Sequence, residues 1–126
     1  MQIFLIVLGG VLGTLSRYFL TTFVNHVGST NHSSVAFPLG TLTVNLIGAF
    51  TIGCLFTLFA NNDNVIKPFL MIGFLGAFTT MSGFTYEAMT IFEDEAYIKA
   101  IIYALLGSGG PLIACCLGVQ IVKRLA

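Results

Sequence analysis

The third apolar stretch of the chain contains, near its middle, the segment GAFTTMSGFT (residues 76–85). Glycine adopts non-helical backbone angles at little cost and threonine is a mediocre helix former, so this cluster weakens a helix. The stretch as a whole, residues 65–92, would span about 42 Å as one helix, more than the ~30 Å of a bilayer core. Tilting alone could absorb that length. The glycine and hydroxyl cluster nevertheless predicts a broken helix, whose irregular backbone must be buried in protein or line a cavity.

Charged residues are scarce along the whole chain. Of its 126 residues, five are Lys or Arg and five are Asp or Glu, 8% in all, whereas 56% are hydrophobic. A soluble domain carries about 25% charged residues, and a disordered chain combines high charge with low hydrophobicity. The composition excludes both classes. A net charge of zero provides no basic field, so we expect no nucleic-acid partner. The chain is expected to lie among membrane lipids.

Four apolar stretches are long enough to cross a bilayer as helices, which requires ~20 residues each. They cover residues 2–24, 37–60, 65–92 and 98–122. Their apolar runs are continuous and lack the ten-residue alternation of a membrane β-barrel. The first stretch has no basic leader or cleavage site and is expected to be retained. The sequence therefore predicts a single all-α domain, residues 1–126, that crosses the cell (inner or plasma) membrane four times.

Two charged residues fall well inside these stretches, Arg17 and Glu87. An ionisable side chain at membrane depth is costly and is a functional hypothesis by default. Arg17 follows a Gly9-x-x-x-Gly13 step, a spacing that lets another backbone approach closely. Its guanidinium either reaches back to the membrane interface or faces an anion vestibule.

Asn45 is the single amide of the second stretch and recurs at helical spacing with Thr41, Ala49 and Gly53. Such a stripe either joins two membrane helices by hydrogen bonding or presents the Asn45 amide as a donor in a pore. In the third stretch Phe84 shares a face with Thr80 and Glu87. Its ring edge is electropositive, but an aromatic at this spacing is more often part of the core.

The cysteines and histidines give no metal-ligand spacing. Cys54, Cys115 and Cys116 lie within apolar stretches and are expected to be buried structural thiols. His26 and His32 lie in the first connection without an acidic or thiol partner nearby, which favours solvated loop residues over a metal site.

Three motifs follow one another along the chain. They are Gly10 with Arg17-Tyr18 seven residues on, the run GTLTVN (residues 40–45), and GxxGxxTTxSxFxxE (residues 73–87). In this order, and spread over nearly the whole chain, they resemble the bacterial fluoride channel family, CrcB or Fluc.

This resemblance implies a fluoride-selective channel that exports F⁻ passively and so lowers cytoplasmic fluoride. It implies an antiparallel, dual-topology-type dimer with two pores and a structural Na⁺ at the centre of the dimer interface. The backbone carbonyls of Gly76 and Thr79 would coordinate this Na⁺, and Arg17 would lie at the vestibule. The implied fluoride path consists of Asn45, Met81, Ser82, Phe84, Thr85, Glu87 and Ser108.

The chain also departs from the family pattern. Met81 replaces one of two pore phenylalanines and lacks its fixed positive ring edge, and Gly83 replaces a pore hydroxyl residue. On the polar face of the fourth stretch, Ser108 is the only hydroxyl left, among Gly107, Pro111 and Cys115. Either the chain is one partner of a heterodimer with a sister subunit and one working pore, or it is a homodimer that tolerates Met81.

The positive charges bear on this choice. Lys67, Lys123 and Arg124 fall on the side of the termini, against Lys99 on the other. This weak bias favours cytoplasmic termini and fits a subunit of fixed orientation.

Three other classes of protein are alternatives to a channel. A small four-helix proton-coupled multidrug exporter requires a carboxylate in the first helix, and none occurs there. A non-conducting membrane assembly subunit could use small-residue faces such as Gly110, Ala114 and Gly118. An enzyme is not expected, because no nucleophile–base pair or metal cluster can be assembled.

Overall fold

The computed structural model describes residues 1–28, 36–60 and 65–125, and within these ranges every regular element is a helix. Helix α1 covers Gln2–Gly28, α2 Leu39–Leu58 and α5 Tyr97–Leu125. The third span consists of a π-helix η1 (Pro68–Leu75), a short turn of helix α3 (Gly76–Phe78) and helix α4 (Met81–Glu93). These bounds agree with the expected stretches to within about one helical turn.

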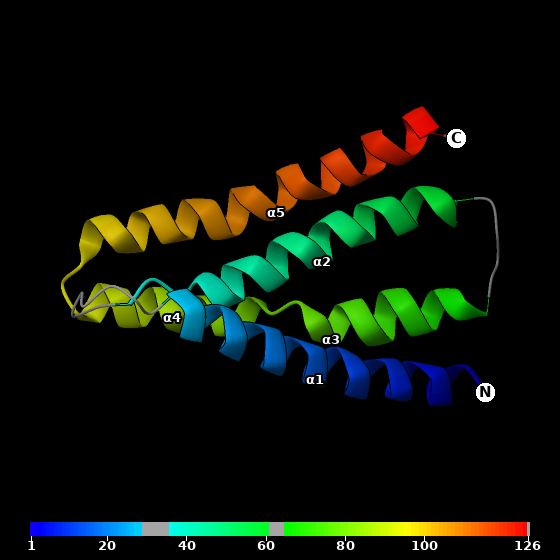
Figure 1. Ribbon diagram of the computed structural model, residues 1–126, viewed down its shortest axis with the longest axis horizontal. Helices are drawn as coiled ribbons and strands as arrows, with labels where there is room; N and C mark the ends of the chain where they lie inside the picture. Colours follow the sequence, from blue (N-terminus) through cyan, green and yellow to red (C-terminus); the bar gives the residue numbers. More distant parts are fainter. Residues whose placement is uncertain (29–35, 61–64, 126) are drawn as a thin grey trace.

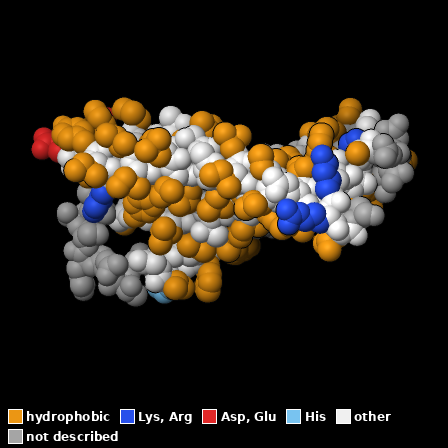
Figure 2. Space-filling model, turned by 90° about the horizontal axis from the view of Figure 1, so that it is seen from above, with side chains coloured by type: hydrophobic (Ala, Val, Ile, Leu, Met, Phe, Trp, Pro, Cys, Tyr) orange, Lys and Arg blue, Asp and Glu red, His pale blue; other side chains and the backbone are white. Residues whose placement is uncertain are grey.

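The four spans are each long and apolar enough to cross a membrane. They run along the length of the molecule, and the N- and C-termini lie at the same end (Figure 1). Hydrophobic side chains are spread along the face seen in Figure 2, and acidic side chains are visible at one end. The prediction of an all-α, multi-pass membrane protein is confirmed.

Glycines set the distance between neighbouring spans. A Cβ on Gly13 of α1 would overlap the carbonyl oxygen of Phe74 in η1, and one on Gly118 of α5 would overlap that of Phe50 in α2. Backbones thus touch directly, which is how membrane helices associate when lipid tails compete for apolar side chains. The close approach expected from the Gly9-x-x-x-Gly13 step is confirmed, with η1 as the partner.

The same contacts bear on the assembly-subunit alternative. Gly118 packs on the α2 backbone of its own chain, and a Cβ on Gly110 would lie 3.0 Å from Leu46 of α2. Gly118 is therefore buried within the chain, whereas Gly110 contacts α2 and stays half-buried.

The third span is broken where the sequence predicts, although the glycines do not form the break. Helix α3 ends at Phe78, and Thr79 (φ −81°, ψ 154°) and Thr80 (φ −146°, ψ 117°) are extended. Figure 1 shows the resulting non-helical link between α3 and α4. Gly76, in contrast, has helical angles (φ −62°, ψ −31°). The extended region is open to β-branched residues, so threonine can occupy it without the freedom of glycine.

We expect Gly118→Ala to destabilise the protein, because its methyl group would overlap the α2 backbone and force α2 and α5 apart. Gly109→Ala in the same helix is the matched control, since a Cβ there meets nothing within 4 Å. Overpacking costs roughly 1–3 kcal/mol, whereas replacing an open helical glycine by alanine gains up to about 1 kcal/mol. Thermal unfolding in detergent measures both; equal shifts for the two variants would contradict this packing.

Candidate functional site

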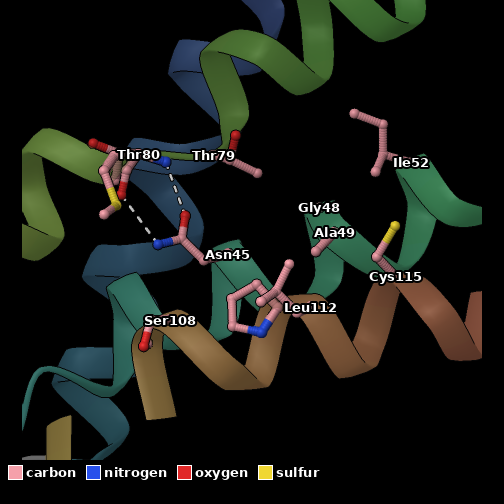
Figure 3. Close-up of a pocket in the computed structure, with 12 residues that line it drawn as sticks. Asn45, Gly48, Ala49, Ile52, Thr79, Thr80, Ser108, Leu112 and Cys115 are labelled. Atoms are coloured by element: carbon pink, nitrogen blue, oxygen red, sulfur yellow. Dashed lines mark hydrogen bonds between the residues drawn. The ribbon is translucent and has the colours of Figure 1, made fainter. Parts of the chain in front are cut away.

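The centre of the site is a pair of hydrogen bonds between the Asn45 side chain and the peptide groups of Thr80. Asn45 Oδ1 accepts from the Thr80 N–H at 2.8 Å, and Asn45 Nδ2 donates to the Thr80 carbonyl at 3.0 Å. Figure 3 shows both bonds crossing from α2 to the break. Backbone groups that leave a helix inside a membrane need such partners, because water is not available to them. The Asn45 side-chain amide therefore gives Thr80 the hydrogen-bond donor and acceptor that other peptide groups supply inside a helix.

Further contacts fix Thr79 and the start of α4. The Thr79 hydroxyl donates to the Leu75 carbonyl at 3.0 Å, which also accepts from the Thr79 N–H. Gly48, one turn after Asn45, leaves room for Thr79, since a Cβ on Gly48 would overlap the Thr79 methyl group. The Thr80 hydroxyl caps α4 by accepting from the Gly83 N–H at 3.1 Å. The break therefore packs on the face of α2 that carries Asn45 and Gly48.

These bonds affect two carbonyl groups at the break. In a continuous helix the Thr80 N–H would donate to Gly76 and the Gly83 N–H to Thr79, four residues back. Here the first donates to Asn45 and the second to the Thr80 hydroxyl. The Gly76 and Thr79 carbonyls, the ligands predicted for a cation, thereby lose their helical donors, and so do the Ala77 and Phe78 carbonyls, because Met81 and Ser82 lie in the first turn of α4.

A groove of about 450 Å³ lies beside the break, between α2 and α5, and we call it the break groove. It brings together the predicted residues Asn45, Met81 and Ser108, together with Thr79 and Thr80 (Figure 3). Its complete lining is Asn45, Gly48, Ala49, Ile52, Thr79, Thr80, Met81, Gly107, Ser108, Pro111, Leu112 and Cys115. The α5 positions identified in the sequence as a face, Gly107, Ser108, Pro111 and Cys115, therefore all face this groove.

A second pocket, of about 440 Å³, lies between α1 and the start of α4, and we call it the α1 pocket. It holds the predicted residues Arg17 and Ser82. Its lining is Thr14, Arg17, Tyr18, Thr21, Thr22, Thr41, Thr80, Ser82 and Gly83. Thr80 lines both pockets, so the break is the point at which they adjoin. The structure thus places six of the predicted site residues in two pockets, whereas Gly76, Phe84, Thr85 and Glu87 line neither.

Glu87, which lines neither pocket, forms a separate polar cluster. Its Oε1 accepts from the Thr41 hydroxyl at 2.7 Å, and its Oε2 accepts from the Tyr103 hydroxyl at 2.6 Å. Thr41 and Tyr103 are both buried. A carboxylate at membrane depth is tolerated when charge-assisted hydrogen bonds satisfy it. Sequence reasoning missed Tyr103, although an embedded glutamate signals that donors must come from neighbouring helices.

Phe84 lies in the core next to this cluster. Its ring packs on Tyr103 with centroids 5.1 Å apart, and Tyr103 in turn meets Phe37 edge to face at 5.3 Å. Gly107 makes room for the Phe84 ring, because a Cβ there would overlap it. Within one chain Phe84 is therefore a core residue, as the alternative reading of its spacing proposed; its place in a fluoride path stays a prediction.

Two predicted hydroxyl donors point along their own helices. Thr85 donates to the Met81 carbonyl at 2.9 Å, and Ser108 donates to the Ala104 carbonyl at 2.7 Å. Such back-bonding is the usual arrangement of hydroxyls within a helix. Each group must rotate before it can donate to an ion. Met81 is 68% exposed at the edge of the break groove.

The cysteines and histidines contribute little to the site. Cys54 and Cys115 are half-buried free thiols, but Cys116 is exposed, so the expectation of burial is wrong for it. His26 lies in the last turn of α1, and His32 falls outside the described residues. Within residues 1–28, 36–60 and 65–125, no three side chains of His, Cys, Asp or Glu gather to hold a metal. Backbone carbonyls are the ligands that the break offers instead.

Four apolar spans, a third span interrupted at membrane depth, and two pockets that adjoin at the interruption define a multi-pass membrane protein of the channel or transporter class. The family model described as "CrcB-like protein, Camphor Resistance (CrcB)" matches residues 4–119. The chain belongs to this family.

Relatives over nearly the full length carry more specific names. The chain is 41% identical to the Fluoride-specific ion channel FluC of Campylobacter fetus, over 96% of this chain and 93% of the relative. It is 37% identical to FluC 2 of Staphylococcus saprophyticus, over 100% of both chains, and 37% identical to FluC 1 of Staphylococcus aureus, over 96% of both.

We expect Asn45→Asp to destabilise the break. The substitution removes the Nδ2 donor and places a carboxylate oxygen against the Thr80 carbonyl, so a buried acceptor faces a negative charge. The loss is expected to reach about 2 kcal/mol or more. Thr43→Val on the same helix is the control, because the Thr43 hydroxyl donates to its own helix at Leu39. Thermal unfolding in detergent compares them. An Asn45→Asp variant as stable as the control would show that the two hydrogen bonds between Asn45 and Thr80 do not contribute to stability.

Proposed function

We propose that this chain is a subunit of a fluoride-selective channel through which F⁻ leaves the cell passively, lowering cytoplasmic fluoride. The relatives named above are fluoride-specific ion channels, and they match this chain from end to end. The observation in the structure that best supports the proposal is the break held by Asn45, with uncharged donors gathered around it. It places polar groups at membrane depth in an otherwise apolar chain.

The chemistry of the ion explains why such donors suit it. Fluoride is small and strongly hydrated, so it crosses a membrane only where protein groups replace its water. A conducting site must bind the ion moderately, because the ion has to leave as readily as it enters. We infer that Asn45, Ser82, Thr85 and Ser108 offer such donors, with the Phe84 ring edge and polarizable Met81 beside them.

We also propose that the break holds a structural sodium ion. The Gly76 and Thr79 carbonyls have lost their helical donors to Asn45 and the Thr80 hydroxyl, which is the chemistry that a hard cation requires. Carbonyls from two chains would complete the coordination at the centre of a dimer. When bound, the ion supplies positive charge that offsets part of the cost of an anion nearby.

A dimer would also enclose the break groove, which a single chain lines on one side only. We propose an antiparallel pair. The relatives named FluC 1 and FluC 2 are consistent with paired subunits, which would place this chain, with Met81 and Gly83, opposite a sister that carries the missing groups. A homodimer whose pore tolerates Met81 is the other possibility.

The rival functions have less support. Helix α1 carries no Asp or Glu, so it has no carboxylate of the kind that a proton-coupled exporter exchanges. The small residues Gly110 and Gly118, which favoured an assembly subunit, pack within the chain.

Fluoride efflux from liposomes tests the channel proposal. The chain is reconstituted alone and with a sister subunit, and external fluoride is followed with an ion-selective electrode against a chloride control. We expect rapid fluoride efflux in at least one case and little chloride efflux. Asn45→Asp should lower fluoride efflux at least tenfold, since it also adds like charge beside the anion. Folded dimers that release no fluoride in either case would refute the proposal.

Exchange of sodium for a bulky organic cation tests the proposed ion. We expect the detergent-solubilised protein to unfold at a lower temperature in N-methylglucamine chloride than in sodium chloride, because an ion that binds only the folded state stabilises it. Potassium chloride controls for ionic strength. An unfolding temperature that is the same in all three salts would exclude a sodium ion that contributes to stability.

A further inference from the structure

Basic side chains gather at the end of the molecule where α2 and α5 finish. Lys123 and Arg124 are exposed in the last turn of α5, and Lys67 directly precedes η1. Figure 2 shows most of the visible Lys and Arg side chains toward this end and acidic side chains at the other. Asp63 falls outside the described residues. The acidic residues that the structure describes all belong to α4 or to its link with α5: Glu87, Glu93, Asp94 and Glu95.

The basic side chains lie close to one level along the membrane normal. Helices α2 and α5 run in the same direction (Figure 1), and the Cys54 thiol, 3.7 Å from the Gly118 carbonyl oxygen, marks their register. Five residues further along each helix, Phe59 at the end of α2 is therefore level with Lys123 of α5. The Lys67 Nζ donates to the Phe59 carbonyl at 3.4 Å, which places the Lys67 ammonium at this level too.

The lengths of the two helices give the depth of this level. Helix α2 has 20 residues and spans about 30 Å, the thickness of the hydrocarbon core, so its C-terminal end lies near the core boundary. Helix α5 has 29 residues, spans about 43 Å and extends beyond the core. Lys123 and Arg124 therefore lie at the level of the lipid phosphates, where long basic side chains reach polar partners.

One face of α5 combines these charges with apolar side chains. Gln120, Lys123 and Arg124 are spaced three and four residues apart, and all three are exposed. Ile113 and Leu117 lie on the same face, one and two turns deeper in the membrane, and are exposed as well. The face thus has hydrogen-bond donors at the level of the phosphates and an apolar surface below them, which is the division of a phospholipid into headgroup and acyl chains.

We propose that this face of α5 is a binding site for an anionic phospholipid, and we call it the α5 lipid site. The Arg124 guanidinium and the Lys123 ammonium bind the phosphate, and the Gln120 amide donates to it. The acyl chains lie along Leu117 and Ile113. Lys67, at the same level, adds positive potential, which favours an anionic headgroup over a zwitterionic one. The site does not depend on which ion the protein conducts.

The thermal unfolding of the full chain in a nonionic detergent tests the site. Dioleoylphosphatidylglycerol is titrated into the micelles, and the mole fraction that gives half-maximal stabilisation is measured, with dioleoylphosphatidylcholine for comparison. Arg124→Gln removes one charge from the site, and Lys123→Gln with Arg124→Gln removes two. Lys99→Gln, which removes one charge at the opposite end of α5, is the matched control. Inorganic phosphate tests whether a free anion suffices.

We expect phosphatidylglycerol to stabilise the native chain at a lower mole fraction than phosphatidylcholine. Each charge removed from the site should raise the half-maximal mole fraction of phosphatidylglycerol about fivefold, the equivalent of about 1 kcal/mol for each basic residue at an anionic surface. The double variant should therefore show a rise of roughly 25-fold. Lys99→Gln should keep the native value, and inorganic phosphate should not stabilise the protein, because it has no acyl chains to bind α5.

Four outcomes would overturn the α5 lipid site. The first is equal stabilisation by the two lipids, and the second is an equal effect of Arg124→Gln and Lys99→Gln, which would indicate net charge alone. The third is stabilisation by inorganic phosphate as strong as by the lipid, the mark of an adventitious ion only. The fourth is a double variant that is less stable without lipid but responds to phosphatidylglycerol as the native chain does. That result would assign Lys123 and Arg124 to the α5 dipole or to a second chain.

Discussion

The fold depends on the need to satisfy the peptide groups of Thr80 inside a membrane. A helix broken at this depth exposes an N–H and a carbonyl where no water can reach them. Asn45 satisfies both with one side chain. The neighbouring residue, Thr79, packs on α2 at Gly48 and donates its hydroxyl to the Leu75 carbonyl of η1. Because the Thr80 and Gly83 N–H groups donate to Asn45 and to the Thr80 hydroxyl, the Gly76 and Thr79 carbonyls lose their helical donors. Two pockets adjoin at Thr80. An apolar residue at position 45 would leave the Thr80 N–H and carbonyl without these hydrogen-bond partners.

Glycine contacts make this arrangement possible by bringing α2 against α5 and α1 against η1. The first half of the third span packs on α1. The second half, α4, packs on α5 through Phe84 and Tyr103. The break lies at the transition between these two sets of contacts. Packing from opposite sides explains why the two halves of one span need not share a single helix axis, and why each side of the break has its own pocket.

The sequence was sufficient to predict the four spans and the position of the break, because apolar length and clustered weak helix formers are local properties. It attributed the break to the glycine and hydroxyl cluster as a whole, and within that cluster the extended residues are Thr79 and Thr80. The position of the break within that cluster is fixed by Asn45, which lies 35 residues away and bonds to Thr80. Local helix propensity does not include such a distant contact. Tyr103 was missed for the same reason: its contact with Glu87 depends on which helix lies opposite. Nothing in the run PFLMIGFL, residues 68–75, distinguishes the observed π-helix from an α-helix.

The scarcity of charge can now be related to the proposed passage of an anion. Glu87 would repel such an ion, but it lines neither pocket, and hydroxyl groups of α2 and α5 donate to both of its oxygens. Arg17 would hold the ion too firmly if it stood at the break; it lies instead in the α1 pocket, among hydroxyls that share the contact. Between them the break offers amide, hydroxyl and backbone dipoles alone. A charged side chain in direct contact with a small, poorly polarizable anion would bind it so strongly that it could not leave, whereas several dipoles release it in steps. In the proposed channel, Arg17 would attract the ion toward the break, and Glu87, outside both pockets, would not line its path.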